Sequence, residues 1–187
     1  MQKIVYISGF TGGKRDIFLS KRILKDYKMI YFKYNTFLIQ RVEEIGKELQ
    51  KFIKSINLNK KEKINLIGLS AGGIIALYYA KFLDKEKLVN KIVTIHSPIK
   101  GTCLPRLFSK KFKGLKQMQT NSKFIKKLSK NKTKINQLNF WNYIDLLVPG
   151  KSGKGENPIQ DYIPHLPTAY WPPIYYKIKK FFDNKQN

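Results

Sequence analysis

The segment Gly68–Gly72 constrains the fold more than any other part of this sequence. It reads Gly-Leu-Ser-Ala-Gly, follows the apolar run 64–67, and precedes a helix-like run that begins with small residues. A strand, a tight turn with a serine at its tip and a helix together force the serine into a strained backbone conformation. Bulky side chains two residues before or after the serine would collide, which explains the two glycines. The helix N-terminus below the serine favours negative charge there. A packing turn with a bystander serine is the alternative interpretation.

Strand-like and helix-like segments alternate along the chain. Short runs rich in Ile, Val, Tyr and Phe predict strands over 3–8, 28–34, 63–69, 91–96 and 135–143. Helices are predicted over 14–27, 37–56, 71–83, 121–129 and 172–182. This order predicts an α/β fold with a mainly parallel sheet covered by helices on both faces. With 187 residues we expect a single domain over 1–187, with its chemistry at the carboxyl ends of the strands and a loop over 150–157.

The net charge is extreme for a chain of this size. There are 37 Lys and Arg residues against 12 Asp and Glu residues, a formal net charge of +25. The stretch between Glu86 and Asp145 contains no acidic residue and is rich in lysine. It favours either an anionic partner, such as a phospholipid surface, nucleic acid or an acidic carrier, or simply a solvated face of a lysine-rich protein.

The cysteine count bears on the compartment. Cys103 is the single cysteine, so no internal disulfide can form, which fits a reducing compartment. No apolar run approaches the length of a membrane span, and no leader-like segment is visible. We therefore expect a cytoplasmic protein, either free in the cytoplasm or peripherally associated with a membrane surface.

A serine nucleophile needs a base, an acid that orients the base, and donors for the oxyanion. The sequence has two histidines, His96 and His165. Hydrolases with a serine at such a turn carry their three residues in the order serine, acid, histidine. His165 satisfies that order, whereas His96 follows the serine with no well-placed acid between them. The acid is predicted to be Asp145, which directly follows the strand 135–143; the competitor is Asp161, which can equally be a loop cap.

Two backbone N–H groups are expected to form the oxyanion hole. One belongs to Ala71, the residue after the nucleophile. The other belongs to Phe10, in the glycine-rich loop that follows the first strand. The same loop also fits a plain strand-to-helix turn. A phosphate-binding loop is disfavoured because the run 9–14 lacks the required spacing and the Ser or Thr after the lysine.

Together these features resemble the small α/β-hydrolase lipases. Residues 93–102 are similar to the Thr-Pro-His-x-Gly segment of those enzymes and of inositol-deacylase-like relatives, and residues 117–125 resemble their following helix. The resemblance implies an α/β-hydrolase fold of about six strands, without a large lid domain, that acts on carboxylic esters. The sequence departs from the pattern at two places. Ser8-Gly9 replaces the usual His-Gly, and the histidine stands before the proline, as His96.

The expected function is therefore that of an esterase or lipase. Ser70 would attack the acyl carbonyl, with His165 as base and Asp145 orienting it, and no metal or cofactor would be needed. Expected partners are a small-molecule ester or lipid and an anionic membrane surface, without specific nucleic-acid recognition. Residues expected to suit an acyl chain are Phe10, Leu104, Leu107, Phe108, Leu146, Leu166, Tyr170 and Trp171. Two alternatives stay open: a thioesterase or other acyl-transfer hydrolase with the same three residues, and a non-catalytic hydrolase-fold protein that binds anionic surfaces.

Overall fold

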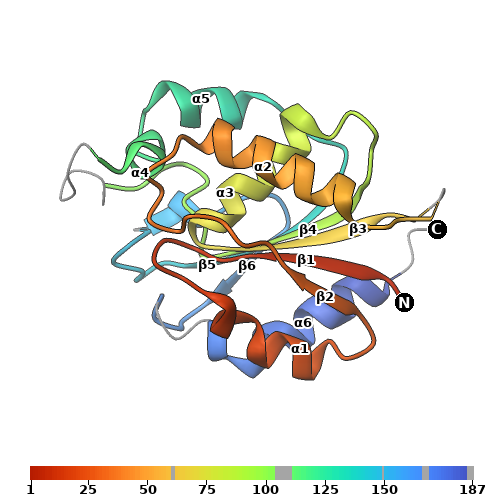
Figure 1. Cartoon of the computed structure of the whole chain (residues 1–187). Helices are drawn as coiled ribbons and strands as arrows, with labels where there is room; N and C mark the ends of the chain where they lie inside the picture. Colours follow the sequence, from red (N-terminus) through yellow and green to blue (C-terminus); the bar gives the residue numbers. More distant parts are fainter. Residues whose placement is uncertain (60–61, 104–110, 149, 166–168, 185–187) are drawn as a thin grey trace.

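Six parallel strands form one sheet at the centre of the molecule. The computed structural model describes residues 1–187 except 60–61, 104–110, 149, 166–168 and 185–187 (Figure 1). The strands lie in the order β2-β1-β3-β4-β5-β6, and every neighbouring pair is parallel. Their bounds are β1 Lys3–Ile7, β2 Lys28–Tyr31, β3 Ile64–Leu69, β4 Val89–Ile95, β5 Asn136–Asn142 and β6 Pro158–Asp161.

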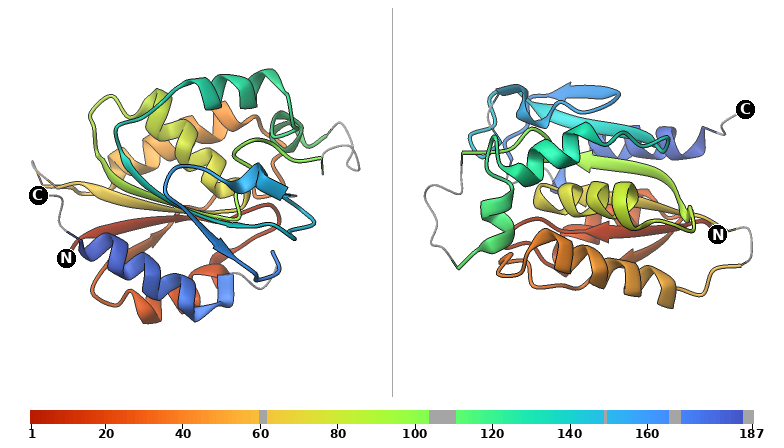
Figure 2. Two further views of the ribbon diagram at one scale, coloured as in Figure 1. Left: turned by 180° about the vertical axis from the view of Figure 1, so that it is seen from behind. Right: turned by 90° about the horizontal axis from the view of Figure 1, so that it is seen from above.

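Helices cover both faces of this sheet (Figures 1 and 2). One face carries α1 (Phe18–Ile23), entered through the 3-10 turn η1 (Lys14–Ile17), together with α6 (Pro172–Asp183). The other carries α2 (Val42–Ser55), α3 (Ala71–Tyr78), α4 (Lys113–Gln117) and α5 (Lys123–Lys130). Within the described residues, no helix has the length and apolar character needed to cross a membrane. The predicted parallel sheet with helices on both faces is confirmed.

The sequence is apolar along the central strands because these strands are buried on both faces. Every residue of β3 up to Gly68 is buried, because helices cover both sides of the strand. Helix α3 is buried along its whole length, between the sheet and the outer helices. It continues into a π-helical turn, η2 (Tyr79–Leu83). The turn between β3 and α3 is therefore fixed from both sides by packed elements.

Several element boundaries differ from the predictions. The helix predicted over 37–56 begins only at Val42, because the chain first makes a turn in which Leu38 has a φ of 54°. The helix predicted over 14–27 divides into η1 and α1 and ends at Ile23. Residues 150–157, predicted as a loop, contain the 3-10 turn η4 (Gly150–Gly153). Strand β6 and helix α4 were not predicted at all, because neither short segment has a periodic apolar pattern.

Candidate active site

Ser70 lies at the tip of the turn between β3 and α3. Its φ of 51° and ψ of −121° place it outside the ordinary regions for an L-residue. Its N–H donates to the carbonyl of Ile95, at the end of the neighbouring strand, over 2.7 Å. A Cβ on Gly68 would lie 2.4 Å from the helix backbone, and one on Gly72 would lie 2.1 Å from the carbonyl oxygen of Ile7. The strained conformation and the need for both glycines agree with the predicted turn.

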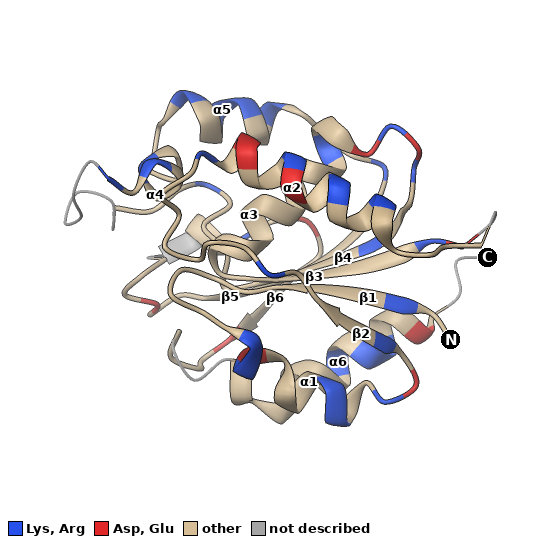
Figure 3. Ribbon diagram, viewed as in Figure 1, with Lys and Arg blue, Asp and Glu red and all other residues tan. Residues whose placement is uncertain are grey.

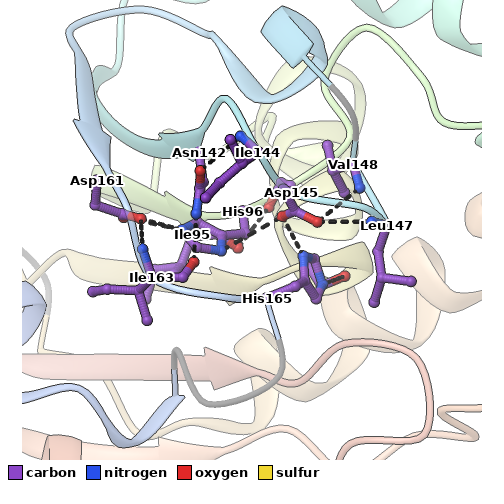
Figure 4. Close-up of polar contacts among 12 residues, drawn as sticks. Ile95, His96, Asn142, Ile144, Asp145, Leu147, Val148, Asp161, Ile163 and His165 are labelled. Carbon is purple, nitrogen blue, oxygen red and sulfur yellow. Dashed lines mark hydrogen bonds and ion pairs between the residues drawn. The ribbon is translucent and has the colours of Figure 1, made fainter.

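The structure brings His165 to this serine and Asp145 to His165. Figure 4 shows the pairing of His165 with Asp145. Oγ of Ser70 lies 2.9 Å from Nε2 of His165, and Nδ1 of the same ring lies 2.6 Å from Oδ2 of Asp145. Oδ1 of Asp145 accepts hydrogen bonds from the N–H groups of Leu147 at 2.8 Å and Val148 at 3.0 Å. Asp145 follows β5, and His165 follows β6, so both groups come from the carboxyl edge of the sheet.

Opposing effects act on the Asp145 carboxyl. Burial raises its pKa, but the hydrogen bond and charge of His165, together with the backbone N–H groups of Val148 and Leu147, outweigh burial and hold the pKa below its ordinary value. The carboxylate is therefore ionised at neutral pH. An ionised acceptor at this position favours a proton on Nδ1 of His165, and Nε2 is then the nitrogen that faces Oγ of Ser70.

The loop after β1 approaches the serine closely. A Cβ on Gly9 would lie 2.8 Å from Cβ of Ser70, so only glycine allows this approach. The hydroxyl of Tyr34 donates to the carbonyl of Ser8 over 2.7 Å and holds the start of the loop. Both residues predicted to supply oxyanion donors, Phe10 and Ala71, line the same cavity as Ser70.

That cavity has a volume of about 380 Å³ and a mainly apolar lining. Of the residues expected to suit an acyl chain, Phe10 and Tyr170 line it. Leu146, which is 90% exposed, and Trp171, which is 45% exposed, are not among its described lining residues. The remaining expected residues, 104, 107, 108 and 166, lie outside the described part of the chain. Apolar lining residues that the sequence did not reveal are Leu115, Met118, Leu147, Val148 and Ala169.

His96 is not among the described residues that line this cavity. It is buried directly after β4, and its side chain has no exposed surface. Nε2 of His96 lies 2.9 Å from both carboxylate oxygens of Asp161, while Nδ1 lies 3.6 Å from Oδ2 of Asp145. Asp161 also accepts the N–H of Ile163 over 3.2 Å, so it does cap the loop as anticipated. The pairing of His96 with Asp161 was not anticipated.

His96, Asp145 and His165 also have the spacing of a metal site, since one donor atom from each lies within 4.8 Å of the others. The 2.6 Å separation between His165 and Asp145 is that of a short, charge-assisted hydrogen bond with a proton between the two atoms. A metal ion would have to replace that proton, on which the contact with Ser70 depends. We therefore interpret Asp145 and His165 as a hydrogen-bonded pair, with Nδ1 of His96 3.6 Å from the same carboxylate.

The lysines of the acid-free stretch divide into two groups. Lys91 is buried within the sheet, so it does not belong to a solvated or partner-binding face. Others lie along α4 and α5 on the outer surface (Figure 3). There they border a groove of about 540 Å³, which is lined by Arg41, Glu43, Lys113, Lys116, Gln117, Ser122, Lys123, Phe124 and Lys127.

Comparison with known families gives one match. The model of a family described as palmitoyl protein thioesterase matches residues 22–145, more than half of the chain. The matched region includes Ser70, His96 and Asp145 and ends before His165. Among curated proteins, none matches this sequence.

Solved structures resemble the chain over most of its length. A lipase from Bacillus licheniformis in its mature form has a TM-score of 0.77 at 14% identity, covering 97% of this chain and 91% of that one. A gene product of Bacillus subtilis has a TM-score of 0.70 at 15% identity, covering 98% and 100%. Lipase B of Aspergillus fumigatus has a TM-score of 0.69 at 16% identity, covering 86% of this chain and 42% of the lipase. The predicted α/β-hydrolase fold of six strands is confirmed.

Proposed function

This chain belongs to the palmitoyl protein thioesterase family, and from that membership we propose that it is an acyl hydrolase. In this proposal it cleaves carboxylic esters, and Ser70 is the nucleophile. The observation that carries the proposal is the hydrogen-bonded series from Ser70 to His165 to Asp145 at an apolar cavity. A serine within 2.9 Å of an imidazole that a carboxylate orients has the geometry of an activated nucleophile. The cavity beside it suits an acyl chain.

In the proposed reaction, Oγ of Ser70 attacks the acyl carbonyl while Nε2 of His165 takes its proton. Asp145 keeps the ring oriented and stabilises the imidazolium that forms. His165 then gives the proton to the leaving alcohol, and the acyl group stays on the serine. Water attacks the acyl-enzyme with His165 again as base, which releases the acid and restores the hydroxyl.

The charge that develops on the carbonyl oxygen needs donors. We assign this role to the N–H groups of Ala71, at the start of α3, and of Phe10, in the loop after β1. Gly9 supports the second assignment, because its missing side chain lets the loop backbone approach Ser70. One such donor typically contributes roughly 2.7–4 kcal/mol to catalysis.

A thioesterase is the second candidate, and the matched family favours it. The same three residues serve both reactions, because the serine attacks an acyl carbonyl in each and only the leaving group differs. We therefore propose comparing p-nitrophenyl esters, acyl thioesters and amides of equal acyl length. A higher kcat/KM for thioesters would select the second candidate, and a higher value for oxygen esters the first.

Labelling with a fluorophosphonate probe tests the nucleophile. We expect the wild type to label and Ser70→Ala to remain unlabelled, with ester hydrolysis lowered by roughly 10⁴-fold or more. Ser97→Ala is a matched control, since Ser97 is a buried serine after β4 that is not among the described residues lining the cavity. If the wild type does not label, or if Ser70→Ala labels equally, the chain is not a hydrolase of this kind and the non-catalytic alternative stands.

We further propose that the basic groove brings the protein to anionic membranes. Helix α4 supports this because its two sides differ: Leu115 lines the apolar cavity, whereas Lys113 and Lys116 line the groove. Glu43 is the one acidic residue among the described residues of the groove, and it accepts a hydrogen bond from Gln117 over 2.7 Å. An anionic surface held at the groove would present acyl chains next to the cavity.

Two charge-matched variants test this proposal. Lys116→Glu with Lys123→Glu changes the groove, while Lys177→Glu with Lys180→Glu makes the same change in net charge on α6, at the opposite face of the sheet. We expect the groove variant to lose roughly 30-fold in binding to phosphatidylglycerol vesicles at low salt, at about 1 kcal/mol per lysine. The α6 variant should retain its binding. Equal loss in both variants, or equal binding to neutral and anionic vesicles, would contradict a specific role for the groove.

A further inference from the structure

His96 combines a strained backbone with a buried ring. Its φ of 48° lies in the left-handed region, which glycine and asparagine adopt more easily than histidine. The side chain has no exposed surface. Strain of this kind persists only where the surroundings enforce it, and it gathers at functional sites. The position therefore directs attention to what the ring contacts.

Both ring nitrogens of His96 face carboxylates (Figure 4). Nε2 lies 2.9 Å from each oxygen of Asp161. Nδ1 lies 3.6 Å from Oδ2 of Asp145, the same oxygen that is paired with His165. The titratable groups that face this ring among the described residues are Asp145, Asp161 and His165.

The end of β4 also meets the segments that carry the other proposed catalytic residues. The carbonyl of Ile95 accepts the N–H of Ser70, and the next residue, His96, holds Asp161. From Asp161 the chain reaches His165 in four residues. Two consecutive residues, Ile95 at the end of β4 and His96 directly after it, thus contact three segments. Ile95 contacts the turn that carries Ser70. His96 contacts Asp145 and the start of the loop that carries His165.

We infer that His96 and Asp161 form a second histidine–aspartate pair that positions Asp145 and the loop carrying His165. This inference rests on the proposed function. His96 is a positioning residue, because it is not among the described residues that line the cavity and reaches the chemistry through Asp145. The pair transfers no proton during the reaction. It holds Oδ2 of Asp145 between two rings, so that Nδ1–H of His165 keeps its acceptor while charge develops on that ring.

The test separates positioning from stability by measuring two quantities, the rate of fluorophosphonate labelling and Tm. His96→Asn tolerates the left-handed backbone but removes the imidazole partner of the Asp161 carboxylate, whose side chain is only 10% exposed, so both quantities should fall. Asp161→Asn keeps the shape and removes the charge. By analogy with the outer-shell partners of metal-binding histidines, it should slow labelling roughly 10- to 100-fold. The double variant has no unpaired charge, so its Tm should recover while its labelling stays slow.

Asn142→Ser provides the matched control. Nδ2 of Asn142 donates to the carbonyl of Ile163 over 2.6 Å, so it anchors the same segment without placing a charge beside Asp145. This variant should lower Tm and change labelling far less than Asp161→Asn does. For ester hydrolysis, kcat should fall in His96→Asn and Asp161→Asn while KM stays unchanged.

The outcomes distinguish the two claims. If labelling rates follow Tm across all four variants, the pair is merely structural and the inference is overturned. If the wild type labels and both single variants label equally fast, the inference alone fails. If the wild type itself does not label, the proposed function fails and the positioning role fails with it.

Discussion

At Ser70, neighbouring atoms leave the backbone little choice of conformation. The N–H is held by the carbonyl of Ile95, and both flanking glycines approach other backbone atoms more closely than any side chain would permit. The resulting φ of 51° is one that a serine adopts only under such constraint. Strain at Ser70, the proposed nucleophile, is therefore supported by packing around it, which ties the proposed reactivity of the serine to the stability of the turn.

Gly72→Ala tests this link at the residue scale. Its Cβ would lie 2.1 Å from the carbonyl oxygen of Ile7, a backbone atom that cannot move aside without shifting β1. We expect the free energy of unfolding to fall by about 2–3 kcal/mol, as in other overpacked sites, and fluorophosphonate labelling to slow. Urea denaturation measures the first effect. Gly13→Ala is the control, since a Cβ there meets no atom within 4 Å; equal destabilisation by both would refute the steric explanation.

At the scale of elements, a lysine joins the last helix to the sheet. Lys91, on β4, donates through Nζ to the carbonyls of Phe181 at 2.8 Å and Phe182 at 3.3 Å, and also to that of Asn184. The final carbonyls of a helix have no partner within the helix and favour a cation. Burial lowers the pKa of Lys91, and the nearby Asp183 partly offsets this. One lysine of a very basic chain is therefore part of the core.

We predict that Lys91→Met destabilises the protein by about 1–3 kcal/mol, because it leaves buried carbonyls without a donor. The change should appear as a lower midpoint in urea, with α6 the first element to gain amide hydrogen exchange. Lys177→Met, on the exposed side of α6, should change stability by less than about 0.5 kcal/mol. A neutral effect of Lys91→Met would show that water replaces its hydrogen bonds at no cost.

Local pattern predicted the long elements well and the short ones poorly. The apolar face of α2 and the buried runs of β3 and β4 are visible as periodicity in the sequence, and these elements form where expected. Strand β6 begins with proline and is only partly buried, and α4 spans five residues that include a glycine. Neither has a periodic signal. Yet α4 supplies Leu115 to the lining of the cavity, and this residue was not predicted because α4 was not predicted.

At the scale of the whole molecule, charge opposes folding. A net charge of +25 on a chain of 187 residues creates repulsion throughout the compact state. Ion pairs can offset this repulsion in few places, because the chain has only 12 acidic residues and 37 basic ones. The unfolded chain spreads the same charges further apart, so the repulsion favours unfolding.

We therefore predict that salt stabilises the protein. Raising NaCl from about 0.01 M to about 0.1 M shortens the screening length from about 30 Å to about 10 Å. If screening adds about 1 kcal/mol, Tm should rise by roughly 2–4 °C, which circular dichroism can follow. Lys126→Glu with Lys130→Glu, both exposed on α5, should raise Tm at low salt and reduce this dependence. A Tm that is constant or falls with salt would contradict the repulsion argument.

The sequence by itself determined the turn at Ser70 and the partners predicted for it. Glycines around a strand-to-helix serine act through local sterics, and a parallel sheet places the residues after its strands at one edge, so order along the chain was enough to predict Asp145 and His165. Only the tertiary structure decided that His96 pairs with Asp161, 65 residues away, that Lys91 is buried, and which residues line the cavity. Those contacts depend on packing between elements distant in the sequence, for which no local pattern exists.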